Sequence, residues 1–229
     1  MKTLLRAEFY QLAHSKAFWG LLTAVLVLSS LMLLDSRALT QTLFLASLYN
    51  TPLLFFLAMV FTALFVGESF ETRTVAMAVT AGQGRGKALL AKMMICQLAC
   101  AALLALPLTV HGAVGRVVLH MEPGLNAAGW TTLVLALPAM CMLPFFLAVL
   151  CRDVGRTLAG GLVVFFASIL LLNQDFAGQL AQLLPMGQLR LLALQQAVGA
   201  ELRFWAVDAG WVLLLGLGSY GLFCKAELK

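Results

Sequence analysis

The part of this sequence that comes nearest to a catalytic motif is a glycine cluster, Gly82-Gln83-Gly84-Arg85-Gly86-Lys87. A phosphate-binding loop would need Gly at position 81 and Ser or Thr at position 88, but alanine occupies both positions. The cluster does not fit the dinucleotide-binding pattern G-x-G-x-x-G either. We therefore expect this chain to bind no nucleotide, so that any ATP hydrolysis driving it belongs to another polypeptide.

Other reactive side chains are too scattered to indicate a catalytic, cofactor-binding or metal site. The five cysteines lie in or beside apolar runs and show no C-x-x-C or Cys/His spacing, so we interpret them as small buried hydrophobes. His111, His120 and Glu122 fall in a predicted outer loop, where loose histidine spacing is more often incidental than metal-binding. Lys92 and Asp208 each lie one turn inside an apolar run, where we expect them to snorkel or pair at the interface. No enzyme activity is expected.

The composition indicates an integral membrane protein. Of 229 residues, 62% are hydrophobic and 11% are charged, and the mean hydropathy is +0.96, whereas soluble domains have about 25% charged residues. This excludes a disordered chain, a nucleic-acid-binding domain and almost any water-soluble enzyme. A helical crossing needs about 20 mostly apolar residues, and six runs provide them: 17–34, 43–66, 88–110, 130–150, 157–172 and 204–223.

The basic residues predict the orientation of these six spans. With the N-terminus in the cytoplasm, four of the 15 Lys and Arg residues lie outside, namely Arg37, Arg116, Arg190 and Arg203, and the other eleven lie inside. Cytoplasmic loops carry the excess of basic residues, so both termini are expected in the cytoplasm. The net charge of +5 is then a topology signal, and no nucleic-acid partner is expected.

The chain is expected to form one all-α membrane domain over residues 1–229, with six transmembrane helices and three shorter elements. Residues 1–16 predict an amphipathic helix on the inner surface, with an ordinary cytoplasmic tail as the alternative. Residues 67–87 form an inner loop in which Glu68 and Glu71 lie near a predicted helix start. Residues 173–203 are too polar to cross and form an outer segment. Most polar side chains in the spans are interpreted as packing groups, but Tyr49, Asn50 and Thr62 are candidates to face a translocation pathway.

The inner loop resembles that of the membrane subunits of ABC-2-type ABC transporters, particularly small bacterial permeases of bacteriocin or lantibiotic immunity and peptide-antibiotic export. The family pattern places an aromatic residue, Thr, Gly, Arg and Lys at fixed spacings. This chain matches them with Phe70, Thr74, Gly82, Arg85 and Lys92. Two positions depart from the pattern, because Arg73 stands where the family usually has Gly and Ser69 where it often has an acid.

The resemblance implies that residues 68–85 form a coupling helix that docks on a separate ATPase subunit, which would hold ATP and Mg. Glu68, Phe70, Glu71, Thr74, Gly82 and Arg85 are the residues expected at this contact. It further implies a second permease chain, the bacterial cytoplasmic membrane, and export of a hydrophobic or amphipathic compound such as an antimicrobial peptide. The outer segment would hold short re-entrant helices, with interface anchoring as the alternative. The competing function is an ATP-independent membrane scaffold, a sensor subunit or a small carrier.

Overall fold

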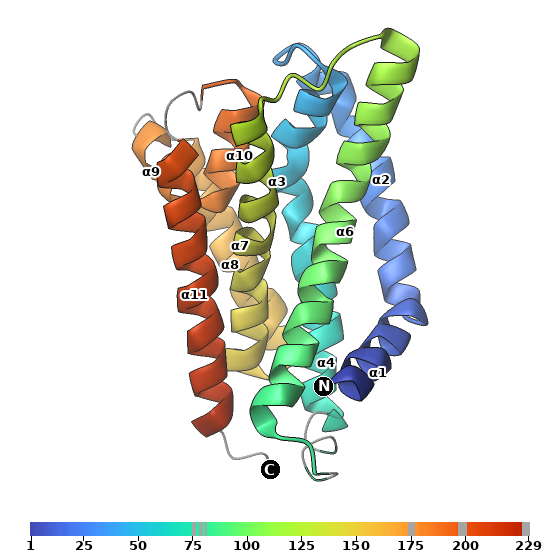
Figure 1. Cartoon of the computed structure of the whole chain (residues 1–229), viewed down its shortest axis with the longest axis vertical. Coiled ribbons are helices and arrows are strands. Elements are labelled where there is room, and N and C mark those ends of the chain that lie inside the picture. The colour runs from blue at the N-terminus through green and yellow to red at the C-terminus, as the bar shows by residue number, and fades with distance from the viewer. Residues whose placement is uncertain (75–76, 78–79, 81, 174–176, 197–200, 226–229) are drawn as a thin grey trace.

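The computed structural model describes residues 1–74, 77, 80, 82–173, 177–196 and 201–225, and within these ranges the chain is helical, with no strand. Six helices are long and apolar enough to cross a membrane, which confirms the prediction of an all-α, multi-pass membrane fold. They form an upright bundle (Figure 1). The six are α2 (Lys16–Ser36), α3 (Leu43–Thr62) with its continuation to Glu71, α6 (Arg85–Leu119), α7 (Ala127–Cys151), α8 (Val154–Leu172) and α11 (Glu201–Lys225).

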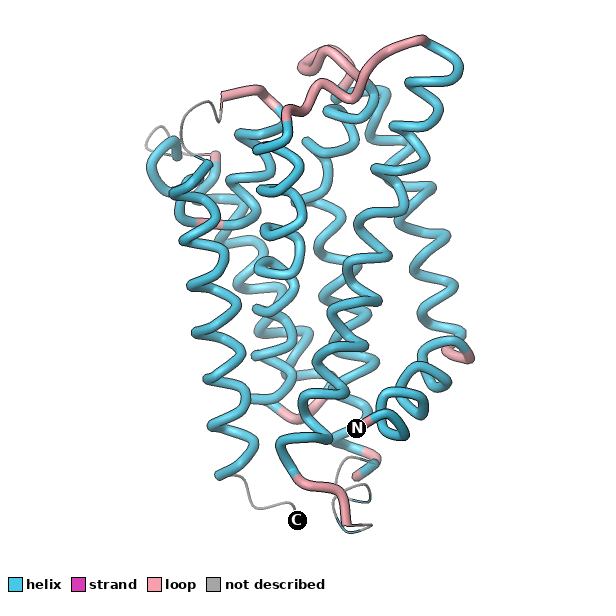
Figure 2. The backbone as a smooth tube through the Cα atoms, in the orientation of Figure 1, coloured by secondary structure: helices cyan, strands magenta, loops and turns pink. Residues whose placement is uncertain are grey.

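The short helices lie at the two ends of the bundle. Helix α1 (Lys2–Ala13) lies at the end that carries the N-terminus, together with α4 (Glu68–Glu71), and α9 (Ala177–Leu183) and α10 (Pro185–Ala193) lie at the opposite end. Following the predicted orientation, these are termed the inner end and the outer end. Figure 2 shows that loops are confined to the two ends, as expected where backbone groups need water or a protein partner.

Two helices form the centre of the bundle, and the others surround them. In the most apolar stretch of α3 and of α7, 61% of the residues are buried, against 17% in α8. Helix α7 packs along α11, and α3 packs along α2 and α6. The outward faces of α2, α8 and α11 are lined with exposed apolar side chains, including Leu31, Phe166 and Leu214, which suits contact with lipid.

Helix α6 is longer than the sequence predicted, and this changes the position of His111. The predicted run ended at residue 110, but the helix continues to Leu119 and has 35 residues. Gly112 and Gly115 let α6 pack closely on α3, because a Cβ at these positions would lie 3.0 Å from the Phe44 side chain and 3.5 Å from that of Leu43. The assignment of His111 to an outer loop is therefore wrong.

The N-terminal residues form a helix, as predicted, which is joined to α2 by a sharp turn. The turn is stabilised by Ser15, whose Oγ accepts a hydrogen bond from the Phe18 backbone N–H at 3.3 Å and so caps the start of α2. The indole of Trp19 donates to the carbonyl oxygen of Ala13 at 2.9 Å. Leu12 is buried, while Phe9 and Tyr10 are exposed, so α1 presents one face to the bundle and one face outward.

The outer segment contains the two short helices expected there, and they pack tightly against each other and against the bundle. Pro185 begins α10, where its missing N–H costs no hydrogen bond, and α10 packs on α3 and α7. Gly187 faces α9 so closely that an added Cβ would overlap the backbone of Ala181. Residues 174–176 and 197–200 of the predicted segment lie outside the described residues.

The contact between α9 and α10 predicts that Gly187→Ala destabilises the protein. Backbone atoms cannot rotate away as a side chain can, so we expect a loss of about 1–3 kcal/mol, measured by thermal unfolding in detergent. Gly160→Ala in α8 is the matched control, since a Cβ there meets nothing within 4 Å. It should be neutral or stabilising by up to about 1 kcal/mol. Equal behaviour of the two variants would contradict the close approach of α9 and α10.

Candidate functional site

The candidate site lies at the inner end, where α3 continues without a break into the predicted coupling segment. After Thr62 the helix passes through a π-helical turn, η1 (Ala63–Gly67), and then through α4. Gly67 lies against α8, because an added Cβ would come within 3.2 Å of the Val154 Cα. Single π-helical turns inside α-helices occur frequently at functional sites.

Glu68 and Glu71 lie in α4, as the first and last residues of that short helix, and α4 continues the long helix that begins at Leu43. Helix α4 stops at Glu71, and Arg73 follows in the left-handed region with φ of +57°. This conformation interrupts the helix, and Thr74, Met77 and Thr80 are helical again beyond it. Residues 75–76, 78–79 and 81 of the predicted coupling helix lie outside the described residues.

Glu71 connects the segment to the start of α8. Its Oε1 accepts a hydrogen bond of 2.6 Å from the backbone N–H of Val154, the first residue of that helix. A carboxylate is favoured at this position because the first N–H groups of a helix lack partners and carry partial positive charge. Asp153 accepts from the Arg156 N–H at 2.6 Å in the same turn. Glu71 therefore holds the fifth span in place.

Phe70 and Arg85 connect the segment to the inner end of α11. The ring of Phe70 meets that of Phe223 edge-on, with 6.0 Å between centroids. Arg85 Nη1 donates to the carbonyl oxygen of Cys224 at 3.4 Å. Two residues of the family pattern, 15 positions apart in the sequence, thus contact the last turns of the same span.

The remaining residues of the pattern shape the loop itself. Thr74 donates to the Ser69 carbonyl oxygen at 3.3 Å, which holds the chain where it turns after α4. Gly82 has φ of +88°, a conformation that favours glycine. Met77 lies in this loop as a large apolar residue that is 57% exposed.

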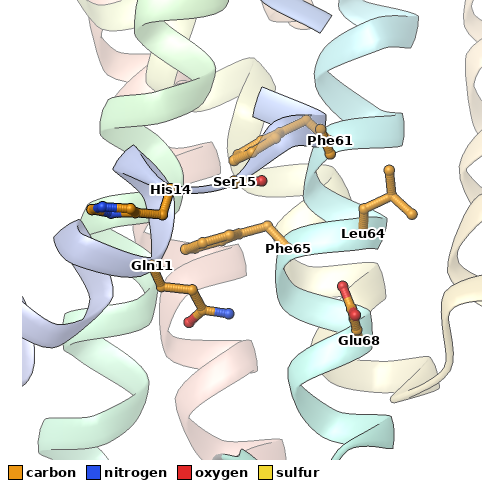
Figure 3. Close-up of a pocket in the computed structure, with 8 residues that line it drawn as sticks. Gln11, His14, Ser15, Phe61, Leu64, Phe65 and Glu68 are labelled. Carbon is orange, nitrogen blue, oxygen red and sulfur yellow. The ribbon is translucent and has the colours of Figure 1, made fainter. Parts of the chain in front are cut away.

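A cavity of about 330 Å³ separates the inner end of α3 from the turn between α1 and α2. Figure 3 shows Phe61 and Phe65 projecting from α3 and η1 toward the turn that carries His14 and Ser15, with Glu68 one turn further along the same helix. The cavity therefore has aromatic walls and a carboxylate at its inner edge. It also leaves space between α1 and the π-helical turn.

Lys92 connects α1 to α6 beside this cavity, a contact that the sequence did not reveal. Only 3% of Lys92 is exposed, and its Nζ lies 2.7 Å from Glu8 Oε2 and 3.3 Å from Gln11 Oε1. The ammonium group also lies 4.5 Å from the centroid of the Phe65 ring. We had expected Lys92 to snorkel or pair at the interface, and it pairs. The partner could not be identified because Glu8 is 84 positions away.

The three pathway candidates lie on different sides of α3. Tyr49 is half-buried and stacks near Arg190 of α10, with 5.5 Å from the guanidinium carbon to the ring centroid. Asn50 is buried and donates to Ser36 Oγ of α2 at 2.9 Å. Thr62 is buried, donates to the Ala58 carbonyl oxygen at 2.9 Å and lies 3.3 Å from Cys100 Sγ of α6. Asn50 and Thr62 therefore make contacts that hold neighbouring helices together within one chain.

The outer half of the bundle contains a buried polar cluster that was not predicted from the sequence. His111 Nε2 lies 3.1 Å from Ser30 Oγ of α2, and His111 Nδ1 lies 3.0 Å from Ser47 Oγ of α3. Ser30 gives its own proton to the Leu26 carbonyl oxygen, so it must accept from Nε2–H. In the neutral ring Nδ1 then accepts from Ser47. The only sequence signal for this cluster is the set of serines in two neighbouring apolar runs.

Cys96, Cys100 and Cys141 are buried and free. The described residues include no group of three or more His, Cys, Asp or Glu side chains that could hold a metal ion. His120, which the sequence had grouped with His111, lies beyond the end of α6 with φ of +53°.

The contact between Lys92 and Glu8 predicts strong coupling between the two residues. Glu8→Gln or Lys92→Met alone leaves one buried group without its partner, and we expect each to cost about 1–3 kcal/mol because Glu8 is partly exposed. The double variant should lose less than the sum of the two, in thermal unfolding or in protease resistance of α1. Strictly additive losses would show that the ion pair does not hold α1 to α6.

The backbone of Arg73 predicts that Arg73→Gly is tolerated or stabilising. The left-handed conformation costs a residue with a Cβ about 1–2 kcal/mol, and glycine removes that cost but gains freedom in the unfolded chain. The thermal midpoint should therefore stay level or rise. Thr72→Gly is the comparison variant, since Thr72 has φ of −78° and gains no such relief, and it also loses the hydrogen bond from Thr72 Oγ1 to the Glu68 carbonyl oxygen and the contact with Thr74 Oγ1. A larger loss in Arg73→Gly than in Thr72→Gly would contradict this assignment.

The inner end is thus a junction at which the segment between α3 and α6 contacts the first turn of α8 and the last turns of α11, beside the cavity that borders α1. Its contacts are hydrogen bonds, ring packing and one adjoining ion pair. No protein-family model matches the sequence, and no curated protein matches it.

Proposed function

We propose that this chain is the membrane-spanning permease subunit of an ATP-driven exporter of the ABC-2 type. A separate ATPase subunit would bind ATP and Mg, and a second permease chain, identical or similar, would complete the pathway in a bacterial cytoplasmic membrane. One observation carries the proposal: residues at the spacing of the family's coupling loop also contact the ends of other spans. Phe70 and Arg85 meet α11, and Glu71 of the same loop meets α8.

These contacts supply a route for movement from the loop into the bundle. A push on the loop at the exposed Met77 would be passed to the start of α8 through Glu71 and to the end of α11 through Phe70. Packed helices respond by shifting as rigid bodies. The π-helical turn η1, which faces the cavity beside α1, is the point at which α3 has room to bend.

The side chains of the spans favour a hydrophobic or amphipathic cargo over a small ion. The apolar stretches of the six helices hold few charged residues, and the ionisable groups that do occur are enclosed: Lys92 is paired, His111 is hydrogen-bonded, and Asp208 is buried. An antimicrobial peptide is the cargo class that we favour. The small permeases whose inner loop this one resembles are exporters, so transport out of the cell is the expected direction.

Met77 provides a test of the ATPase contact that leaves the chain's own packing intact. We expect the chain to copurify with a nucleotide-binding subunit from native membranes, and Met77→Asp to weaken that association by about tenfold or more, because it places a charge in an apolar contact. Met121→Asp is the matched control, since Met121 is an exposed methionine at the outer end.

The readouts are the yield of ATPase subunit per permease and the ATPase activity of the complex. Purification of the unaltered chain with no nucleotide-binding subunit would favour an ATP-independent scaffold, sensor or carrier. Equal retention of the ATPase by Met77→Asp and Met121→Asp would exclude the loop as the docking surface.

A further inference from the structure

The face of α1 that is turned away from the bundle combines basic and aromatic side chains. Helix α1 is followed by the turn at His14 and Ser15, and α2 begins directly afterwards at Lys16, so α1 lies where the first span enters the membrane. Five exposed residues at helical spacing form one stripe along this outward face. They are Lys2, Arg6, Phe9, Tyr10 and Ala13. Aromatic rings and long basic side chains are the groups that suit a membrane–water interface.

No acid balances the charge of this stripe. Glu8 is the only acid among residues 1–16, and its Oε2 lies 2.7 Å from Nζ of Lys92, on the side of α1 that packs against α6. Lys2 and Arg6 form no salt bridge with any described residue, and neither does the exposed Lys16 at the start of α2. The outward face therefore carries uncompensated positive charge and is complementary to an anion.

An apolar cavity of about 210 Å³ adjoins the stripe, between α1, α2 and α6. All of its lining residues are aliphatic or aromatic, and Phe9 and Ala13 belong to both the cavity and the stripe. Phe9, Trp19 and Leu98 of the lining are exposed, so the cavity is open to the surroundings of the bundle. An apolar cavity of about 150 Å³ is enough to hold a benzene molecule. This one therefore has room for part of an acyl chain.

The bases and the cavity follow one another in the order of the parts of a lipid. Lys2 and Arg6 lie in the first turns of α1, whereas the cavity lies at its last turn. Figure 1 shows that the turn between α1 and α2 lies further toward the outer end than the start of α1 does. A lipid of the inner leaflet likewise has its headgroup at the surface and its chains toward the bilayer centre. We propose that this face of α1 binds an anionic lipid of the inner leaflet, with Lys2 and Arg6 at its headgroup and one acyl chain in the cavity.

Two other occupants match only part of the site. A zwitterionic lipid would fill the cavity but offers the two bases no net negative charge. An acidic protein segment would match the bases, but it does not explain an open apolar cavity at the depth of the acyl chains. An anionic lipid would hold α1 on its outward face while Lys92 holds it on the other. The proposal concerns lipid binding by this chain alone and does not depend on an ATPase partner.

Hydrogen–deuterium exchange of the purified chain in nanodiscs tests the headgroup contact. At low salt we expect the amides of α1 to exchange about tenfold or more slowly in phosphatidylglycerol than in phosphatidylcholine with the same chains. The difference should vanish at about 1 M salt, because the charges are then screened. The double variant Lys2→Gln/Arg6→Gln should lose the difference. Arg37→Gln/Arg116→Gln is the matched control, since it removes two exposed bases at the outer end, and it should keep the difference.

Native mass spectrometry after transfer into mild detergent tests the acyl-chain contact. We expect phosphatidylglycerol to stay bound to the unaltered chain, and Ala102→Trp to retain about tenfold less of it because the new ring occupies the cavity. Ala113→Trp is the matched control, since Ala113 is an exposed alanine of the same helix that does not line the cavity. Both substitutions are made at exposed positions, so neither should prevent folding.

Three results would overturn the proposal. Equal exchange of α1 in the two lipids would remove the headgroup contact, and equal lipid retention by Ala102→Trp and Ala113→Trp would remove the acyl-chain contact. Protection of α1 that arises only when a nucleotide-binding subunit is added would make this face a protein contact.

Discussion

The hydrocarbon core of a membrane contains no water to accept or donate hydrogen bonds, so each polar group placed there must find its partner within the protein. This constraint determines which helices are joined and where. Asn50 donates to α2, His111 bridges α2 and α3, and Lys92 of α6 binds Glu8 of α1. The apolar faces can pack in many ways, whereas these polar contacts each specify one neighbour. They fix the arrangement of the first three spans.

The same constraint gives the two ends of the molecule different sets of polar contacts. At the inner end, Glu71, Phe70 and Arg85 connect one loop to the ends of two spans. At the outer end, Trp205, Trp211 and Arg203 connect α11 to α7 and to α9. Between them run continuous helices, which transmit displacement with little deformation. Under the proposed function, α8 and α11 are the route by which a movement of the inner loop would reach the outer helices.

Much of the fold follows from the sequence because the length and hydropathy of a span are local properties. Six spans and the N-terminal helix were predictable in this way, whereas the short outer helices were expected only from the resemblance to ABC-2-type permeases. The pairings were not, since the partners of Lys92 and His111 lie up to 84 positions away. The end of α6 was misplaced, since the predicted run stopped at residue 110 and the helix continues to Leu119, with Gly112 packed on Phe44. Glu71 was assigned to a partner subunit, and only the structure shows that it holds the first N–H of α8.

At Arg73, the sequence pattern and the backbone conformation agree. The spacing of Phe70, Thr74 and Gly82 places Arg73 where the ABC-2-type loops that it resembles usually have glycine. The backbone there has φ of +57°, which is the conformation that glycine adopts at no cost. A left-handed residue is common just beyond the end of a helix, as His120 and Arg152 show in this chain, and at Arg73 it coincides with the glycine position of the resembled pattern. The geometry therefore supports the alignment of the loop, and with it the proposal that this segment receives the movement of an ATPase subunit.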